Sequence, residues 1–375
     1  MNKKILILSF LSVLFLAAGP IRAAIGVTNL RTEQLKNPSG IDTHQPRLGW
    51  RIESNEQNVM QTAYHILVAS SPDLLAQGKG DMWDSGKVET DTSQWITYQG
   101  ENLKRNAPYF WKVKVYTNKG ESDWSSPAFW SMGLFNEADW QGQWIGLDRA
   151  APGDSETQWS RLAARYLRKE FALKKEIKRA TVHIAGMGLY ELFINGQRIG
   201  DQVLAPAPTD YRKTILYNTY DVTSQLQQEN AIGVTLGNGR FYTMRQNYKP
   251  YKIPTFGYPK LRLNLIVEYA DGSKETIATN TSWKLTTEGP VRSNNEYDGE
   301  EYDARKELGN WAQSGYDDKG WIAAQRVSIP SGTLRAQIMP GMKVMDTLKP
   351  VSIQKLGDKY ILDFGQNMAG WVRFR

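Results

Sequence analysis

The sequence predicts an all-β protein, and three observations support this prediction. Apolar and polar residues alternate along several stretches, for example Leu261 to Tyr269, and a period of two residues is typical of half-buried strands. The dipeptides Asn195-Gly196 and Asp271-Gly272 follow such stretches and favour tight hairpin turns. No long segment repeats its apolar residues with the 3.6-residue period of a helix. We therefore expect antiparallel sheets packed as sandwiches.

Length and composition limit the class of protein. With 375 residues and 41% hydrophobic residues, the chain is long enough for two or three globular domains. Aromatic residues make up 11%, which suits β-sandwiches and carbohydrate-facing surfaces. The net charge of +7 is spread among many carboxylates and is weak evidence for nucleic acid as a partner. There is no Cys, so stability depends on hydrophobic cores and not on disulfides.

The first 23 residues have the layout of a secretory signal peptide. Lys3 and Lys4 precede an apolar stretch from Ile5 to Ala18, and small residues follow at Ala23 and Ala24. The apolar stretch is shorter than the roughly 20 residues that cross a bilayer, and no later segment reaches that length. We expect an exported protein without a membrane span, in the periplasm or at the cell surface.

Residues 25–135 are predicted to form a first β-sandwich similar to a fibronectin type III domain. Tyr109 to Tyr116 alternates Trp111, Val113 and Val115 with lysines, and Tyr64 to Ala69 is a second strand signal. Asp84-Ser85-Gly86 is predicted to be a turn. Asp42 and Arg47 are expected to form a structural ion pair across Pro46.

Residues 140–330 are predicted to form a second sandwich of jelly-roll type. Its strand signals include Thr181 to Ala185 and Leu189 to Ile194, each followed by polar or turn residues. Three loop-like stretches could bind a ligand, namely 205–211, 237–242 and 294–305. Aromatic faces contact the C–H surface of a sugar, and carboxylates, amides and arginines bond its hydroxyls. The candidate substrate-binding residues are Asp210, Asn238, Arg240, Tyr242, Glu296 and Glu300.

The stretch from Asn294 to Arg305 carries five carboxylates and two tyrosines. In an extended strand Glu296, Asp298 and Glu300 would share one face. Crowded carboxylates recruit calcium, a basic side chain or polyol hydroxyls, whereas a solvated acidic loop is the simpler alternative. Tyr297 and Tyr302 favour a packed or ligand-facing segment.

Residues 331–375 are predicted to be a linker followed by the start of a further β-domain. Pro330-Ser331-Gly332 and Pro340-Gly341 suit a linker, and Tyr360 to Asp363 reads as a strand. A new domain of about 45 residues cannot bury enough surface to be stable alone, so the sequence is expected to be truncated.

Several of these motifs resemble one family. The stretch N-E-Y-x-G-E-x-Y-D-A-R from Asn295 to Arg305, the opening Pro46-Arg47-Leu48-Gly49-Trp50 and Asp363-Phe364-Gly365-Gln366-Asn367 are similar to bacterial α-L-rhamnosidases of glycoside hydrolase family 78. The chain departs from that pattern at Ala207 and Pro208, where the family often has Gly and Trp before Thr-Asp-Tyr. This departure removes one candidate ring for stacking on a sugar.

The resemblance implies a parent enzyme that removes terminal α-L-rhamnose with inversion from oligo- or polysaccharides. It places the catalytic carboxylates in an (α/α)6 barrel beyond Arg375, so no catalytic residue is expected in this chain and the chain alone should be inactive. Glu296 with Glu301 or Asp303 is a disfavoured acid–base pair. No cofactor is required, and calcium is the candidate ion. A stand-alone rhamnose-binding protein and a structural surface protein are the alternatives.

Catalytic motifs of other enzyme classes are absent from the sequence. It has no G-x-S-x-G, no Walker motif, no H-E-x-x-H and no cysteine ligand set. His44, His65 and His183 are far apart in sequence and are interpreted as structural residues.

Overall fold

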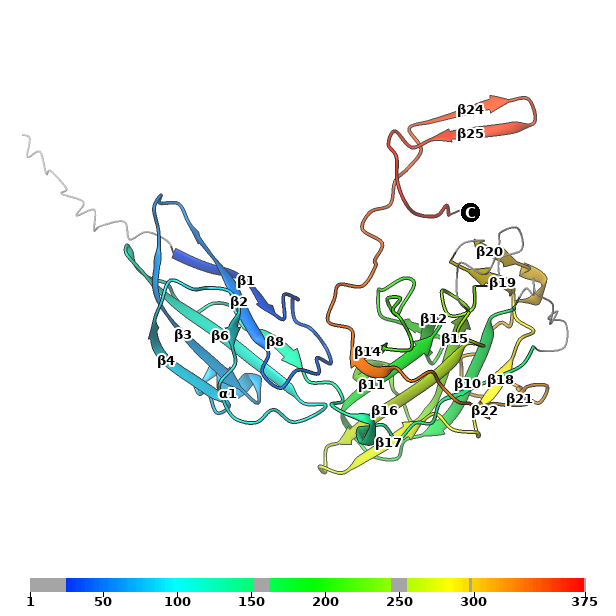
Figure 1. Cartoon of the computed structure of the whole chain (residues 1–375), viewed down its shortest axis with the longest axis horizontal. Helices are drawn as coiled ribbons and strands as arrows, with labels where there is room; N and C mark the ends of the chain where they lie inside the picture. Colours follow the sequence, from blue (N-terminus) through cyan, green and yellow to red (C-terminus); the bar gives the residue numbers. More distant parts are fainter. Residues whose placement is uncertain (1–24, 151–161, 244–254, 297–298, 374–375) are drawn as a thin grey trace, which may run out of the picture. The chain divides into compact units, whose positions relative to one another are not determined.

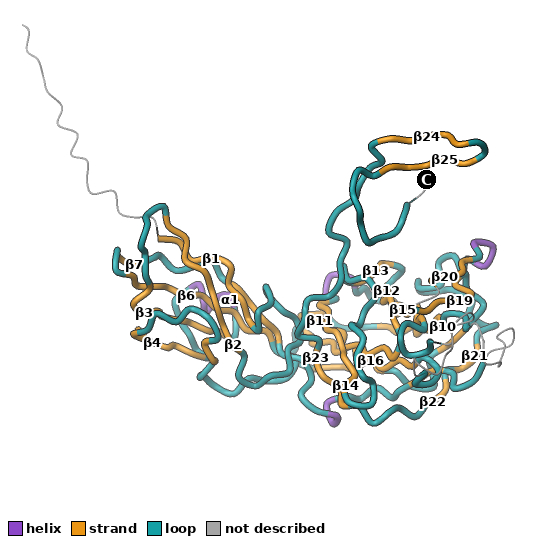
Figure 2. Tube along the Cα trace, turned by 45° about the horizontal axis from the view of Figure 1, so that its top comes forward, coloured by secondary structure: helices purple, strands orange, loops and turns teal. Residues whose placement is uncertain are grey.

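The computed structural model describes residues 25–150, 162–243, 255–296 and 299–373. The predicted signal peptide, residues 1–23, lies outside them. The chain divides into two compact units, and the regular secondary structure of each is almost entirely β-strand (Figures 1 and 2). The first unit extends to Asn37 and adds His44–Asn102 and Pro108–Trp130, while the second comprises Pro38–Thr43, Leu103–Ala107 and the chain from Ser131.

The first unit is a sandwich of two sheets. A three-stranded sheet has the order β1-β2-β5, and a five-stranded sheet has the order β4-β3-β6-β7 with β8 paired to β6. One short helix, α1, begins after the cap Ser71, whose side chain accepts a hydrogen bond from the Leu74 amide. The elements are β1 (Ile25–Thr32), β2 (Arg47–Ser54), β3 (Gln61–Ala69), α1 (Pro72–Ala76), β4 (Trp83–Glu89), β5 (Ile96–Thr97), β6 (Pro108–Thr117), β7 (Gly120–Glu121) and β8 (Ala128–Ser131).

Tryptophans fill the core of this unit. Trp50, Trp111 and Trp130 are each at most 1% exposed. The rings of Trp50 and Tyr64 meet edge to face with centroids 5.4 Å apart, an arrangement favoured by their quadrupoles. The predicted strands around Tyr64 and Trp111 are confirmed as β3 and β6, which pair with each other.

The predicted turn at Asp84-Ser85-Gly86 is wrong, because these residues lie within β4. The register between β3 and β4 shifts between His65 and Leu67, which marks a bulge. Gly86 has φ +58°, and its amide bonds the Asp84 carboxylate. A bulge and a turn share the same residue types, since both need a positive φ and a local side-chain acceptor.

The predicted ion pair between Asp42 and Arg47 is also wrong. In the first unit Arg47 bonds Glu33, with Nη2 and Oε2 2.5 Å apart. In the second unit Asp42 bonds Arg335 at 3.1 Å and accepts the amide of Ala336. Glu33 and Arg335, the observed partners, lie farther away in sequence than the predicted pair. Local spacing of charges therefore could not indicate them.

The second unit is a larger sandwich. One sheet has the order β13-β12-β15-β10-β18-β21, and the other has the order β22-β9-β16-β11-β14-β23 with β17 on β16. All described pairs are antiparallel except β14 with β23. The strands of the first sheet are β10 (Arg165–Ala172), β12 (Leu189–Ile194), β13 (Gln197–Ile199), β15 (Glu229–Gly237), β18 (Lys284–Thr286) and β21 (Ile322–Ala323). Those of the second are β9 (Ile145–Gly146), β11 (Ile177–Met187), β14 (Thr214–Asp221), β16 (Lys260–Tyr269), β17 (Lys274–Ala278), β22 (Gln325–Arg326) and β23 (Thr333–Ala336).

The β11 and β16 strands, both predicted from alternation, form the centre of this sandwich and pair along ten residues or more of their length. Val182 and Ile184 of β11 face the main core between the sheets, whereas Ala185 and Met187 pack in a second cluster with Tyr217 and Phe241. Both faces of β11 are therefore covered, which explains why its alternation is weaker than that of a surface strand.

His183 lies on β11 and is fully buried. Its ring nitrogens are 2.9 Å from Thr219 Oγ1 and 3.0 Å from Asn106 Oδ1. Burial, with a smaller contribution from Arg179, lowers the pKa of His183 to about 3, so the ring is neutral at physiological pH. The interpretation of this histidine as structural is confirmed.

The second sandwich extends past the boundary predicted at residue 330. The stretch expected to be a linker contains β23, which pairs in parallel with β14 and buries Ala336. Farther along, the Val203 amide bonds the Met342 carbonyl. The predicted strand at Tyr360 to Asp363 is confirmed as β25 (Lys359–Asp363), the partner of β24 (Ser352–Leu356) in a separate hairpin.

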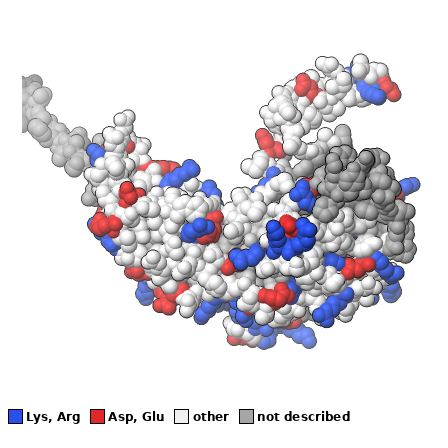
Figure 3. Space-filling model, viewed as in Figure 1, with Lys and Arg blue, Asp and Glu red and all other residues white. Residues whose placement is uncertain are grey.

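The second unit also contains three short described 3-10 turns, namely η1 (Glu137–Asp139), η2 (Thr223–Gln225) and η4 (Ala304–Lys306). Among the described residues, no helix has the length and apolar character that crossing a membrane requires. Basic and acidic residues are interspersed on the visible face of each unit (Figure 3).

Candidate functional site

The segment from Asn294 to Arg305 is a hairpin and not one extended strand. Its two arms are β19 (Val291–Asn295) and β20 (Gly299–Tyr302), with Asn294 opposite Glu300 and Asn295 opposite Gly299. Glu296 and Glu300 therefore lie on either side of a turn, and the prediction that alternation places them on one strand face is wrong. Tyr297 and Asp298, for which predictions were also made, lie outside the described residues.

Asn238 attaches this hairpin to the sandwich. It follows β15 and is 2% exposed. Its backbone amide donates to Asn294 Oδ1 at 2.6 Å. Its side-chain Nδ2 donates to the backbone carbonyls of Asn294 at 2.8 Å and Leu162 at 2.7 Å. These bonds satisfy buried backbone carbonyls, so Asn238 holds structure together and has no donor left for a ligand.

Arg240 and Glu296 form an ion pair at the surface beside these asparagines. Arg240 Nε lies 2.7 Å from Glu296 Oε2, and the side chains are 43% and 37% exposed. The neighbouring Tyr211 is 2% exposed. Burial raises the pKa of Tyr211 to about 12, with smaller opposing effects of Arg240 and Glu296, which places all three groups in one neighbourhood.

Buried aromatic rings fix the loop that carries Arg240. Phe241 is fully buried, and its ring centroid lies 5.0 Å from that of Tyr211 and 5.9 Å from that of Phe256. Tyr242 is 8% exposed and stacks on Tyr258 at 5.7 Å. These rings anchor the loop in the second cluster of the sandwich, so Tyr242 does not present a stacking face to solvent.

Asp210 belongs to the same region but engages its own loop. Its carboxylate bonds the Arg212 guanidinium at 3.0 Å, and its carbonyl accepts the amides of Lys213 and Thr214. The hydrogen bond from the Arg212 side chain lowers the pKa of Asp210. These bonds lie within the loop, so Asp210 shapes the turn before β14.

Glu300 is influenced by a second carboxylate, Glu191, which was not among the predicted site residues. Burial, and then the charge of Glu191, raise the pKa of Glu300. Glu191 is itself paired with Arg198 at 3.1 Å. Across the parts of the chain that the structure describes, no group of three or more acidic or histidine side chains is placed to hold a metal ion.

The structure thus brings Asn238, Arg240 and Glu296 together and adds Tyr211 and Asn294, which the candidate set lacked. The doubled Asn294-Asn295 at the start of the hairpin was a possible signal for the second of these, since asparagines favour local backbone bonds. Asp303 is unsuited to act as a proton donor because of its own partner. A bond from the Arg305 side chain lowers the pKa of Asp303 to about 2.

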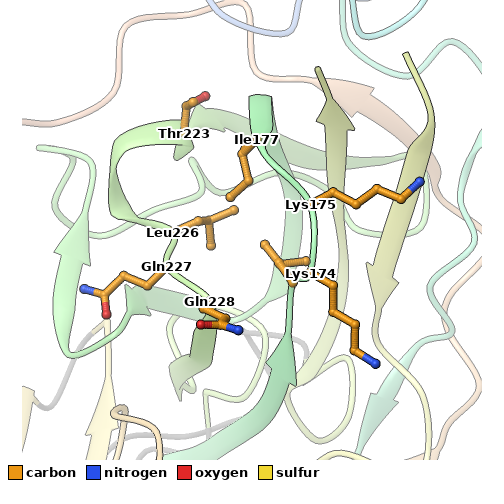
Figure 4. Close-up of a pocket in the computed structure, with 8 residues that line it drawn as sticks. Lys174, Lys175, Ile177, Thr223, Leu226, Gln227 and Gln228 are labelled. Carbon is orange, nitrogen blue, oxygen red and sulfur yellow. The ribbon is translucent and has the colours of Figure 1, made fainter. Parts of the chain in front are cut away.

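A shallow pocket lies elsewhere on the second unit, between the start of β11 and the segment after η2. It has a volume of about 430 Å³ and is lined mainly by Ile177, Leu226, Gln228 and two lysines. In Figure 4 the amines of Lys174 and Lys175 extend away from the aliphatic side chains at its centre. Lys175 Nζ is bound to Asp271 Oδ2 and Ser273 Oγ, each at 2.9 Å. Its charge is therefore already neutralised.

Comparison with known proteins identifies both units. A family model described as the alpha-L-rhamnosidase N-terminal domain matches residues 175–346. Another, described as the Rha78A-like N-terminal immunoglobulin domain, matches residues 27–136. The second match and the two sheets show the first unit to be an immunoglobulin-like sandwich, the same architecture class as the predicted one.

Relatives from several organisms match about nine-tenths of this chain. An alpha-L-rhamnosidase of Formosa agariphila is 38% identical over 90% of this chain and 37% of its own length. The structure of an alpha-L-rhamnosidase from Dictyoglumus thermophilum is 39% identical with a TM-score of 0.80, covering 91% of this chain and 38% of that chain. That of a Streptomyces avermitilis enzyme complexed with L-rhamnose is 25% identical with a TM-score of 0.80, covering 92% and 49%.

The chain therefore spans between about a third and a half of the length of these relatives. The two family models match segments of the first and of the second unit, and two of the three proteins are 38 and 39% identical to this chain. The chain carries the amino-terminal β-domains of the α-L-rhamnosidase family.

Proposed function

We propose that this chain is the accessory portion of an exported α-L-rhamnosidase that hydrolyses terminal α-L-rhamnosyl residues with inversion. The observation that carries the proposal is the similarity over about nine-tenths of this chain to proteins named alpha-L-rhamnosidase. In this proposal the (α/α)6 catalytic barrel belongs to the part of those relatives that this chain does not match.

The described side chains support an accessory role for the second sandwich. An inverting glycosidase needs one protonated and one charged carboxyl roughly 6.5 to 9.5 Å apart. Glu296 is paired with Arg240, and Asp303 is held charged by Arg305. In this proposal these carboxylates brace loops, and the catalytic carboxyls belong to another part of the enzyme.

Hydrolysis of p-nitrophenyl α-L-rhamnopyranoside tests the proposal. A polypeptide extended to the length of the relatives should release nitrophenol, and the first sugar product seen by proton NMR should be the β-anomer. The 375-residue chain alone should release none. Turnover by the short chain, or an α-anomer as first product, would contradict the proposal.

Export is tested by the mass of the natural polypeptide in the cell-envelope fraction. Cleavage near Ala23 should leave a mature protein beginning at or close to Ala24. Recovery of the polypeptide in the cytoplasmic fraction with Met1 still attached would refute export.

A stand-alone rhamnose-binding protein is the alternative. The exposed Arg240–Glu296 pair, with Glu300 on the other side of the hairpin turn, favours it because these groups can bond vicinal hydroxyls. Calorimetric titration of the chain with L-rhamnose, with added calcium and with EDTA, tests both the sugar and the ion. Binding that is lost in Glu296→Gln would support this role, and a natural polypeptide no longer than this chain would favour it over the enzyme.

A further inference from the structure

Trp95 is an exposed tryptophan in the first unit with an unusual backbone conformation. It is 53% exposed, and its φ is +60°. A positive φ is an outlier for a bulky residue and persists only where the surroundings enforce it. Gly or Asn would adopt this conformation at lower cost, so the presence of Trp calls for a role of the ring.

A cation held by a buried carboxylate supports the ring of Trp95. The Arg47 guanidinium lies 4.5 Å from the centroid of the indole ring. Glu33 fixes that guanidinium through bonds to Nε and Nη2, and Glu33 also accepts the Arg47 amide at 2.7 Å. The side chain of Glu33 is only 4% exposed, so a buried carboxylate anchors the cation that covers one face of the indole.

The residue before Trp95 is fixed as well. Gln94 Nε2 donates to the Trp50 carbonyl at 2.6 Å. A side chain at Gly49 would collide with this amide, since a Cβ there would lie 2.7 Å from Gln94 Oε1. The indole is thus presented in one orientation before any ligand arrives, and such preorganisation lowers the entropic cost of binding.

The surroundings of Trp95 indicate what kind of ligand it suits. In the first unit, the described large apolar residues that are exposed are Trp95 and Met60, and the Met60 amide bonds Asn118 near the turn between β6 and β7. Protein interfaces need a contiguous apolar centre, which a single ring among polar residues does not supply. A sugar ring, by contrast, offers one flat C–H face of the size of an indole, rimmed by hydroxyls.

We propose that Trp95 is a stacking platform for a pyranose ring, with Arg47 as the positioning residue that holds the indole. The sugar lies on the indole face opposite Arg47. This platform is a carbohydrate contact on the first unit, remote in sequence from Asn238, Arg240 and Glu296. The choice of a rhamnoside as the sugar rests on the proposed function, whereas the stacking geometry does not.

Fluorine NMR of the 375-residue chain labelled with 5-fluorotryptophan tests this site directly. The resonance of Trp95 is identified by its disappearance in Trp95→Ala. Titration with methyl α-L-rhamnopyranoside should shift this resonance in a saturable way, and glycerol at equal concentration should not. Calorimetric titration with the same rhamnoside should show an affinity roughly tenfold lower in Trp95→Ala and partly recovered in Trp95→Tyr.

Matched variants separate stacking from a general effect on the fold. Trp371 is 67% exposed, and Trp371→Ala should bind the rhamnoside as the parent chain does. Arg47→Ala should weaken binding less than Trp95→Ala while broadening the Trp95 resonance, because the ring loses its support. Melting temperatures close to that of the parent chain show that the variants are folded.

An unmoved Trp95 resonance at a rhamnoside concentration that saturates other signals would overturn the proposal, as would an equal shift with glycerol. Neither result bears on hydrolysis, which is measured separately on the longer polypeptide. Failure of that assay would in turn leave a saturable shift at Trp95 standing.

Discussion

The central strands of the second sandwich and the β24–β25 hairpin have similar local chemistry but opposite surroundings. Both pairs are antiparallel and both contain aliphatic and aromatic residues. In β16 nearly every residue is buried, whereas every residue of β25 is exposed, including Tyr360 at 63% and Ile361 at 51%. Turn chemistry and cross-strand pairing are therefore enough to form a hairpin, but burial depends on a second layer.

This difference separates what the sequence could predict from what it could not. The strands β11, β12 and β16 were predictable because alternation and Asn-Gly or Asp-Gly turns are local signals. The pairing of β23 with β14 was not, since it joins segments far apart in sequence and the short stretch Thr333–Ala336 follows residues typical of a linker. Local patterns carry no information on such long-range partners.

The candidate site also has features that the sequence could predict and features that it could not. Loop residues with suitable side chains could be selected from composition, and Asn238, Arg240 and Glu296 do lie together. Their roles could not be predicted, because whether an amide bonds a ligand or a neighbouring carbonyl depends on tertiary contacts. Tyr242 illustrates this point, since it was selected as a sugar contact and is buried against Tyr258.

The largest effect is expected at Trp283 in the core of the second sandwich. Its side chain is fully buried, and Nε1 donates to the Ala278 carbonyl at 3.1 Å. Trp283→Ala should lower the free energy of unfolding by about 3–5 kcal/mol through the cavity it leaves. Urea denaturation followed by circular dichroism measures this loss. A loss below about 1 kcal/mol would show that the sandwich is packed no better than the hairpin.

A pH-dependent effect of intermediate size is expected from His183. Its pKa is about 6.5 when unfolded and about 3 when folded, so below pH 6.5 the unfolded chain binds a proton that the folded chain excludes. This contribution to stability is complete above pH 6.5 and is lost as the pH falls toward 3.

Urea midpoints between pH 6 and 4 measure this loss, with His183→Gln as the control that keeps polar atoms without titrating there. Relative to that variant, the parent chain should lose about 1.4 kcal/mol per pH unit over this range. Parallel pH profiles for the two proteins would mean that His183 is hydrated in the folded state.

A smaller effect is expected where Asn238 joins the β19–β20 hairpin to the sandwich. Asn238→Ala removes the side-chain bonds to two carbonyls and should cost about 1–3 kcal/mol. Hydrogen exchange of the Asn294 and Glu301 amides should also accelerate, because the hairpin loses its attachment. Gln227→Ala, at an exposed position, is the matched control and should change neither quantity. Unchanged exchange in Asn238→Ala would assign the attachment to other contacts.

The smallest effect is expected in the β24–β25 hairpin. Tyr360→Ala should change the stability of this chain by less than about 0.5 kcal/mol, as is usual for exposed positions. The same substitution in a polypeptide of the length of the relatives should cost about 3 kcal/mol or more if a further layer covers the hairpin. Equal small losses in both polypeptides would show that the hairpin stays exposed in the longer protein.

The parallel pairing of β23 with β14 has a consequence for synthesis. The ribosome makes β14 long before β23, and until then the outer edge of β14 offers its unpaired amides and carbonyls to any neighbouring strand. The outer edge of β14 is therefore covered only late in translation, when β23, the last strand of the sandwich, has been synthesised. A nascent chain that stalls before Thr333 would carry an open sheet edge, and chaperones would need to shield it.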